Sequence, residues 1–349
     1  MTALPPVNEV LNSPTEANAK SLYSLVLEAE AAASGHEQNL VRSRILGYLI
    51  LHPLGDQSRA RVLLEIASCN RNHDNRNEVL YQLGEFYLQH FIRPFRKTKG
   101  PTPVPSSHPS RPSFDRLQES IKEVLQHSPQ DHKTAKSSAL IRDDFRCMVT
   151  GAVDRASARK YKKVAEQAVG KRILKTECCH IFPESTNNLD GKVSDKVDYA
   201  AGVWTVLDMF GYREIREELE GSKIHRLENI MTLTTDIHDM MDCLELWFEE
   251  VKDKENCYRI QIRGPDPQLF MKGGDIPSQV QFVAHHNLPL PSPKYLRIHA
   301  ACCRVAHLSG AAEYLDRVLR DMEELPVLAE NGASADVLAH ALLYLVPPV

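Results

Sequence analysis

Apolar residues recur every three or four positions along the N-terminal part of the chain, which is the spacing of one buried helix face. This pattern predicts four helices, over residues 17–34, 37–52, 57–69 and 75–92. Gly35 follows the first of them and Pro53 follows the second, and both residue types are common where helices end. We therefore expect a helical module over residues 1–92, with a disordered leader in its first sixteen positions.

The composition changes after this module. Residues 93–113 begin with a basic run and continue with a stretch rich in proline and serine. Such a stretch is typical of an extended linker. A nuclear-import signal at its basic start is the lesser alternative, because short basic runs are common. A helix is then expected over 114–127, and residues 140–151 predict a helix end, a short strand and a turn at Thr150-Gly151.

The second half of the chain mixes strand and helix patterns. β-Branched, aromatic and cysteine residues lead to His180, and a similar short run begins at Asn229, so both segments are expected to be strands. A polar loop and a helix interrupted near Gly211 separate the two. Further helices are expected over 236–248, 293–309, 311–325 and 334–345, and further strands over 257–262 and 279–284.

Composition limits the possible environments of the protein. The sequence has no apolar run of about 18 residues, so we expect no transmembrane helix and no membrane partner. The N-terminus lacks the apolar segment of a signal peptide, which indicates an intracellular protein, with nucleus or cytoplasm left open. The eight cysteines include no C-x-x-C pair. We expect them to be mainly buried thiols rather than a zinc ribbon.

Charge is unevenly distributed along the chain. The net charge is −4, yet residues 154–175 contain eight Lys or Arg against two acidic residues, and 8 − 2 gives a local charge of +6. The basic side chains that we expect to contact nucleic acid are Arg155, Arg159, Lys160, Lys162, Lys163, Lys171 and Arg172. Phosphate binding and a merely solvated helix face are weighed evenly as interpretations of this segment.

Three side chains along the chain have the chemistry of phosphodiester hydrolysis. A neutral imidazole such as that of His180 can accept a proton from water near neutral pH. An amide such as that of Asn229 can hold the loop that carries this base. The imidazole of His238 can bind a divalent cation, which stabilises charge on the phosphate and on the leaving oxygen.

Four segments, at residues 145–151, 177–183, 229–233 and 236–242, together resemble the HNH endonuclease domain, in the variety found in fungal proteins. The resemblance implies an α+β, mostly helical protein around a ββα-metal core. It also implies that His180 is the general base, that Asn229 orients it, and that His238 binds a divalent metal ion (Mg, Mn or Zn).

The residue before the base is an Asp or His that also binds metal in many members of this family. Here that position is Cys179, and a thiolate suits zinc better than magnesium. Glu177 shares a strand face with Cys179, and Asp242 lies four residues after His238 on the same helix face, so both are further candidate ligands. No partner can be assigned to three other histidines, which are His225, His285 and His286.

The resemblance and the composition together suggest four parts. These are a helical module over 1–92, a linker over 93–113, an HNH nuclease-like domain with a helical insertion over 114–265, and C-terminal helices over 266–349 that pack on the nuclease domain. The leading hypothesis is a metal-dependent endonuclease that acts on DNA. The alternatives are a catalytically inactive HNH fold that binds nucleic acid or protein, and a helical adaptor built on the N-terminal module.

Overall fold

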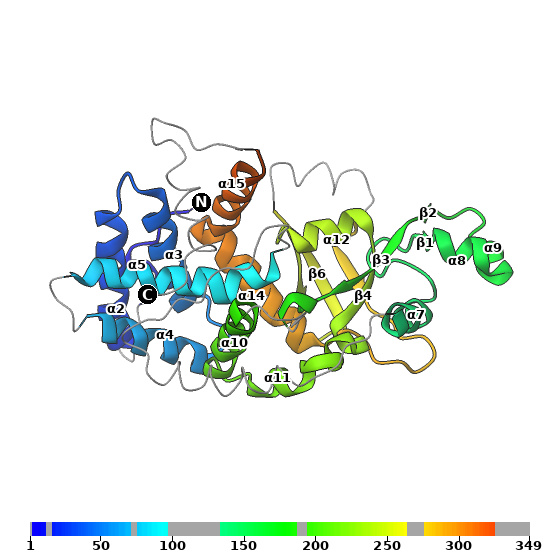
Figure 1. The fold of residues 1–349 in the computed structure, drawn as a ribbon, viewed down its shortest axis with the longest axis horizontal. Helices are drawn as coiled ribbons and strands as arrows, with labels where there is room; N and C mark the ends of the chain where they lie inside the picture. The colour runs from blue at the N-terminus through cyan, green and yellow to red at the C-terminus, as the bar shows by residue number, and fades with distance from the viewer. Residues whose placement is uncertain are drawn as a thin grey trace. The chain divides into compact units, whose positions relative to one another are not determined.

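The computed structural model contains two compact units, each assembled from stretches that are far apart in the sequence (Figure 1). The described residues are 2–11, 16–70, 75–96, 133–186, 194–263 and 276–324. Unit 1 takes its described residues from Met1–His127, Ser185–Glu217 and Arg304–Val349, and unit 2 takes its own from Ser128–Glu184 and Glu218–Cys303. The expected linker beyond residue 96 and the helices expected over 114–127 and 334–345 lie outside the described residues.

Unit 1 is helical throughout the part of it that the structure describes. Its helices are α1 (Val7–Val10), α2 (Ala17–Ala32), α3 (Glu37–Leu51), α4 (Asp56–Cys69), α5 (Arg76–Tyr87), α10 (Ser194–Met209) and α15 (Ala311–Glu324). The four N-terminal helices expected from the apolar spacing are therefore confirmed. Gly35, after α2, has a positive φ of 86°, which explains why glycine is favoured at this helix end.

The residues expected to begin an exposed basic linker are instead buried. A π-helical turn (Leu88–Ile92) and a 3-10 turn (Arg93–Phe95) continue α5. Arg93 is only 3% exposed, and its guanidinium donates a hydrogen bond of 3.0 Å to Gln89. Arg96 forms an ion pair of 2.7 Å with Asp316 on α15. The linker prediction is therefore wrong for residues 93–96, because these cations are held by neighbouring polar groups within unit 1.

The helical insertion between the two histidine-bearing segments belongs to unit 1. α10 ends before Gly211, as expected, and α11 (Arg213–Leu219) follows it. Gly211 has a φ of +92°, and a Cβ at this position would lie 2.5 Å from the side chain of Gln57. The Tyr212 hydroxyl donates a 3.0 Å hydrogen bond to the Leu54 carbonyl. The sequence-based domain boundaries had placed this insertion in the nuclease-like domain instead.

Unit 2 carries all the strands among the described residues. They are β1 (Val153–Asp154), β2 (Ile173–Leu174), β3 (Thr176–His180), β4 (Ile230–Thr234), β5 (Leu246–Glu250), β6 (Cys257–Ile262) and β7 (Gln279–Gln281). β1 and β2 form a parallel pair, β3 and β4 an antiparallel pair, and the last three strands an antiparallel sheet. Its helices are α7 (Lys133–Arg142), α8 (Arg155–Lys160), α9 (Lys162–Gln167), α12 (Thr235–Asp242) and most of α14 (Pro293–Ser309).

Two local predictions in unit 2 are corrected. The helix expected over 236–248 ends at Asp242, because Leu244 adopts a positive φ of 62° and the next residues enter β5. Pairing of β5 with β6 outweighs the helix propensity of this segment. The short strand expected near residue 146 is a single bridge between Arg146 and Val153. The α+β, mostly helical fold itself is confirmed.

A buried ion pair connects the parts of unit 2. The guanidinium of Arg142 is fully buried at the end of α7 and binds both carboxylate oxygens of Asp143, at 2.7 and 2.9 Å. The same guanidinium donates to the carbonyls of Leu227 and Ile230, at 2.7 and 2.8 Å. Asp143 in turn accepts from the backbone N–H of Thr232 at 3.2 Å. α7 is thereby fixed to β4, which pairs with the strand that carries His180.

Removal of this carboxylate should destabilise unit 2. In Asp143→Ala the buried Arg142 loses its counter-charge, so we expect the free energy of unfolding to fall by about 3–5 kcal/mol. This free energy is measured by urea denaturation, which is monitored through the fluorescence of Trp247 in a Trp204→Phe background. As a control, Glu166→Ala removes a pair with Lys162 in which the side chains are 65% and 89% exposed. Glu166→Ala should change the free energy of unfolding by less than about 0.5 kcal/mol. Equal losses of stability in both variants would contradict the stabilising role of the buried Arg142–Asp143 ion pair.

Candidate active site

Side chains alternate between the two faces of β3. Glu177 and Cys179 point toward α12, where both lie near His238. Cys178 points the other way and packs against Ala135 and Ala139 of α7. Burial raises the pKa of the Cys178 thiol to about 12, so this thiol stays protonated at neutral pH. Of the two adjacent cysteines, only Cys179 therefore belongs to a polar cluster.

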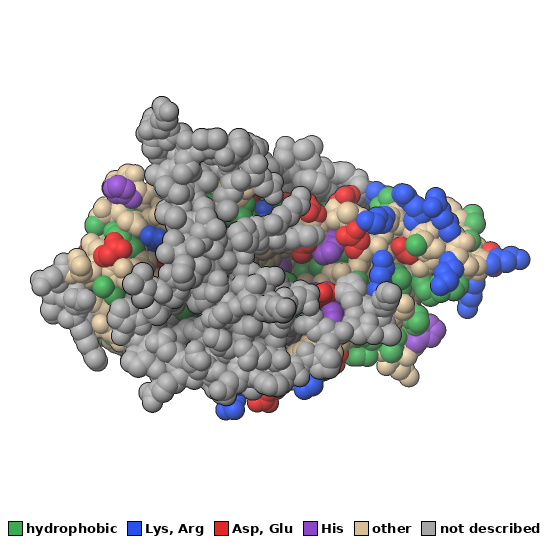
Figure 2. All heavy atoms as spheres, in the orientation of Figure 1, with side chains coloured by type: hydrophobic (Ala, Val, Ile, Leu, Met, Phe, Trp, Pro, Cys, Tyr) green, Lys and Arg blue, Asp and Glu red, His purple; other side chains and the backbone are tan. Residues whose placement is uncertain are grey.

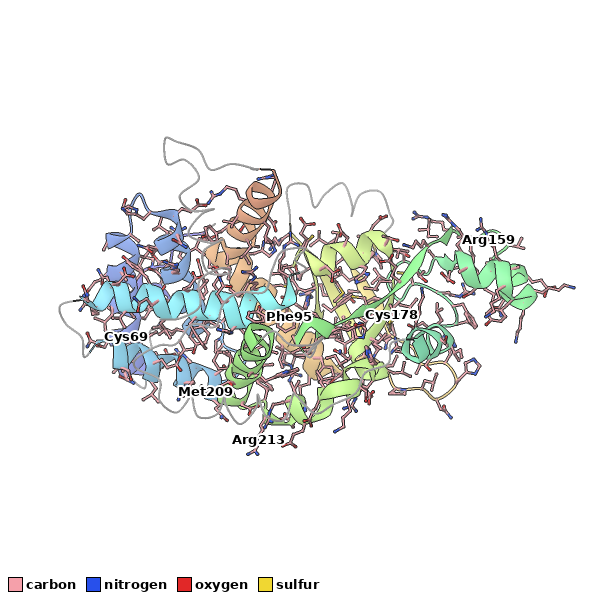
Figure 3. The ribbon with its side chains drawn as sticks, in the orientation of Figure 1. Cys69, Phe95, Arg159, Cys178, Met209 and Arg213 are labelled. Carbon is pink, nitrogen blue, oxygen red and sulfur yellow. The ribbon has the colours of Figure 1, made fainter. Side chains whose placement is uncertain are left out.

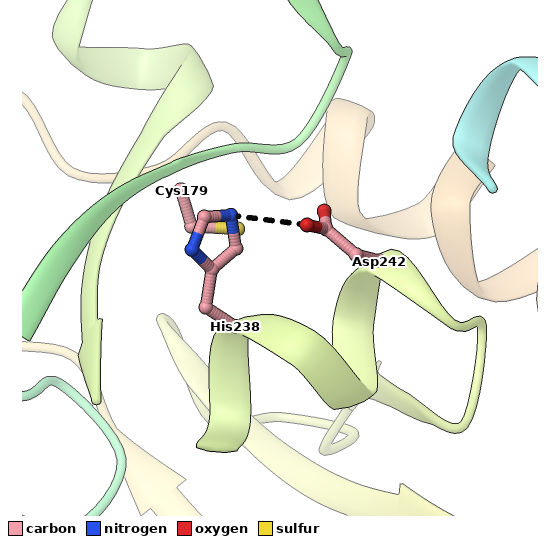
Figure 4. A group of neighbouring side chains, drawn as sticks. All are labelled: Cys179, His238 and Asp242. Carbon is pink, nitrogen blue, oxygen red and sulfur yellow. Dashed lines mark ion pairs between the residues drawn. The ribbon is translucent and has the colours of Figure 1, made fainter. Parts of the chain in front are cut away.

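Cys179, His238 and Asp242 present three possible metal ligands to one another (Figure 4). One donor atom from each lies within 4.8 Å of the others. The Nε2 atom of His238 is 3.4 Å from a carboxylate oxygen of Asp242. Cys179 is fully buried, whereas the side chains of His238 and Asp242 are 16% and 18% exposed. The strand thus supplies one ligand and one turn of α12 supplies two.

Glu177 determines which nitrogen of His238 can bind a metal. Its carboxylate lies 2.9 Å from Nδ1 of His238. Hydrogen bonds from Lys175 and His238 lower the pKa of Glu177 below 4.5, so the carboxylate is ionised at neutral pH and can only accept. In the neutral imidazole, Nδ1 of His238 therefore carries the proton. Nε2 then directs its lone pair toward Asp242, which is the carboxylate–histidine–metal arrangement of many metal sites.

The donor set of this cluster fits zinc. Two lone-pair-bearing atoms that face each other, Nε2 of His238 and an oxygen of Asp242, are stabilised by a cation between them. Thiolate, imidazole and carboxylate are all common zinc ligands, and three protein ligands leave a fourth position for water or substrate. Magnesium prefers oxygen ligands and would gain little from a thiolate. The four residues expected at the metal site, Glu177, Cys179, His238 and Asp242, are therefore brought together here.

His180, at the end of β3, takes part in a separate cluster. Its Nε2 lies 3.1 Å from Nδ1 of His225, and its Nδ1 lies 3.6 Å from a carboxylate oxygen of Glu184. Each imidazole side chain is 7% exposed. Sequence reasoning missed His225 and Glu184. His225 ends a 3-10 turn (Gly221–His225) that no motif marks, and only the fold brings it to His180.

Asn229 fixes the two segments that carry these histidines. It is fully buried at the end of a 3-10 turn (Leu227–Asn229), one residue before β4, rather than within the expected strand. Its side-chain carbonyl accepts from the N–H of Phe182 at 2.8 Å. Its amide nitrogen donates to the carbonyls of Phe182 and Ile224, at 3.0 and 2.9 Å. Phe182 follows His180 closely and Ile224 precedes His225, so Asn229 acts on both rings through the backbone.

The basic segment upstream of β3 is anchored at its base, and its lysine and arginine side chains are exposed. Asp154 is buried, caps α8 through the N–H of Ser157 at 2.7 Å and accepts from the Thr176 hydroxyl at 2.9 Å. Burial alone would raise the pKa of Asp154, but these hydrogen bonds lower it. All seven expected contact residues are exposed. Lys and Arg side chains gather over α8 and α9 (Figure 2), and Arg159 lies apart from Cys178 of β3 (Figure 3).

Comparison with known proteins gives a family match for the part of the chain that contains β3, β4 and α12. Residues 147–246 match the model of the HNH endonuclease family. The chain contains an HNH endonuclease domain. The matched stretch includes His180, Asn229 and His238, and it spans β3, β4 and α12, which form the ββα arrangement implied by the sequence. No curated protein and no solved structure matches the chain. None of the described helices combines the length and apolarity needed to cross a membrane.

Serine substitutions on β3 test whether the HNH centre binds zinc as described. Because Cys179 faces His238 and Cys178 faces α7, Cys179→Ser should weaken zinc binding at this centre by at least tenfold, whereas Cys178→Ser should leave it unchanged. Competition of the purified full-length protein against a fluorescent zinc chelator measures both affinities. A similar loss of zinc affinity in the two variants would show that Cys179 is not distinguished from Cys178 as a zinc ligand by its position on β3.

Proposed function

We propose that the protein is a metal-dependent endonuclease that hydrolyses phosphodiester bonds in DNA. The observation that supports this most strongly is the convergence of Cys179, His238 and Asp242, with Glu177 holding the tautomer of His238, inside an HNH endonuclease domain. This arrangement requires two strands and a helix to meet in register.

Each residue has a distinct role in the proposed reaction. A zinc ion at the cluster would neutralise charge on the phosphate and on the departing oxygen. Its ligands are Cys179, His238 and Asp242. His180 accepts the proton of the attacking water. Asn229 is a positioning residue, because its hydrogen bonds hold the backbone at Phe182, just after His180, and at Ile224, just before His225.

The basic segment supports a nucleic-acid substrate. α8 and α9 lie on the same unit as the metal centre, and Asp154 ties the start of α8 to Thr176, the first residue of β3. Exposed lysines and arginines on such a segment can neutralise phosphates that lie beyond the scissile bond. Tyr161 is 42% exposed and has Lys160 above its ring, so an aromatic surface is available among the cations.

One observation favours the second candidate, a catalytically inactive HNH fold that binds nucleic acid. Nε2 of His180 faces His225 and Nδ1 of His180 faces Glu184, so both nitrogens of the proposed base are close to other polar groups. Water activation requires one of these nitrogens to be released. The two candidates therefore differ in whether the His180 ring is free to accept a proton when substrate is bound.

A plasmid-cleavage assay separates the two candidates. With zinc, manganese or magnesium added in turn, we expect cleavage by the wild type and a loss of roughly 10²–10⁴-fold in His180→Ala, because a general base contributes about that much. His285→Ala is the matched control, since His285 is exposed in the same unit and belongs to neither cluster, and it should cleave normally. Equal cleavage by His180→Ala and wild type would refute the assignment of the base. DNA binding without cleavage under any metal would favour the inactive fold.

Neutralising two lysines tests the role of the basic segment. The double variant Lys162→Gln/Lys163→Gln should bind duplex DNA more weakly, and the slope of log affinity against log salt should decrease by up to about 2. Fluorescence anisotropy at several salt concentrations measures both quantities. The control is Lys252→Gln/Lys254→Gln, which removes two exposed lysines elsewhere on unit 2. An unchanged slope in the first variant, or an equal change in both, would exclude α9 as a phosphate contact.

A further inference from the structure

The cluster around His180 has the composition of a metal site of its own. His180, His225 and Glu184 each place one possible ligand atom within 4.8 Å of the others. The nitrogens of the two imidazoles are 3.1 Å apart, and a carboxylate oxygen of Glu184 lies 3.6 Å from Nδ1 of His180 and 3.9 Å from Nδ1 of His225. The cluster draws on three different segments: the end of β3, the turn after it and the Gly221–His225 turn.

The distances within this cluster suit a small cation. Four ligands at 2.0–2.1 Å around tetrahedral zinc are separated from one another by roughly 3.3 Å. The 3.1 Å between Nε2 of His180 and Nδ1 of His225 is close to this value, and a carboxylate oxygen of Glu184 lies 3.9 Å from the same Nδ1 of His225. Two histidines and a glutamate form a familiar zinc ligand set that keeps one coordination position open. Both imidazole side chains are only 7% exposed, so water screens them little.

The surroundings also provide access. A cavity of about 600 Å³ borders His225, and its other lining residues are Ala135, Ser222, the two cations Lys223 and Arg226, and the two carboxylates Glu218 and Glu228. A metal site needs a route by which the ion enters, and this cavity supplies one. Asn229 holds the carbonyl of Ile224, next to His225, and so keeps the His225 segment beside His180 without an ion.

We propose that His180, His225 and Glu184 form a second cation site that takes zinc or a similar divalent transition metal. It shares no residue with the centre at Cys179, His238 and Asp242, although His180 and Cys179 are adjacent on β3. The two sites differ in chemistry: the first contains a thiolate, whereas the second contains only nitrogen and oxygen ligands.

An ion at this second site has a consequence for catalysis. A His180 nitrogen that binds a cation cannot accept a proton from water at the same time. Filling this second site therefore keeps His180 from acting as a base, so cleavage requires that the first site is filled while the second site is empty. This consequence rests on the proposed function, whereas binding of the cation does not, so a direct binding measurement can test the site even if the protein cleaves no DNA.

The test counts metal ions bound by the full-length protein. Apo-protein is titrated with zinc by calorimetry and separately with cobalt, whose thiolate complexes give a charge-transfer absorption that nitrogen and oxygen ligands do not. We expect the wild type to bind two ions in unit 2. His225→Ala should bind one ion and keep the thiolate–cobalt absorption, which also shows that the β3–α12 core is folded. His238→Ala should bind one ion and lose that absorption.

Two further variants complete the design. Glu184→Gln alters a half-exposed side chain, so it tests the same site with little risk to folding, and it should weaken the second ion at least tenfold while the thiolate–cobalt absorption persists. His285→Ala, which removes an exposed histidine outside both clusters, should still bind two ions. The proposal is overturned if the wild type binds no ion that His225→Ala removes, or if Glu184→Gln binds every ion as tightly as the wild type.

Discussion

Neighbouring side chains of β3 point to opposite faces, and the antiparallel pairing with β4 fixes which face each one takes. Five consecutive pairs, from Thr176 with Thr234 to His180 with Ile230, hold this register. A slip of one residue would exchange the faces and separate Cys179 from His238. The buried Arg142–Asp143 pair supports the same register from α7, because it binds the backbone of β4 at both Ile230 and Thr232.

This register explains why the HNH domain holds two polar clusters rather than one. Glu177 and Cys179 meet α12, so they join His238 and Asp242. His180 is the last residue of the strand and meets His225 there. Asn229 belongs to neither cluster by direct contact, yet its hydrogen bonds hold the backbone next to both histidines of the second one.

Carboxylates set the chemical state of the first cluster. Glu177 lies at Nδ1 of His238 and leaves Nε2 as the atom that could bind a metal, while Asp242 faces that Nε2 from four residues further along α12. Because the pKa of Glu177 is lower in the folded protein than its usual value of 4.5, the ionised carboxylate contributes to folding stability above about pH 4.5. This contribution is lost as the pH falls through the pKa of Glu177 in the folded state. A sulfur donor such as Cys179 would suit zinc better than magnesium.

The sequence by itself determined the elements with strong local signals. Apolar spacing placed α2 to α5, and the ordered motif placed His180, Asn229 and His238, with alternation and helix spacing adding Glu177 and Asp242. Only the tertiary structure could decide features that depend on contacts between distant segments. It ended α12 at Asp242 because residues 246–250 pair with β6, it buried Arg93, and it moved the insertion at 185–217 to unit 1. It also brought His225 to His180 across 45 positions, which no local pattern of residues encodes.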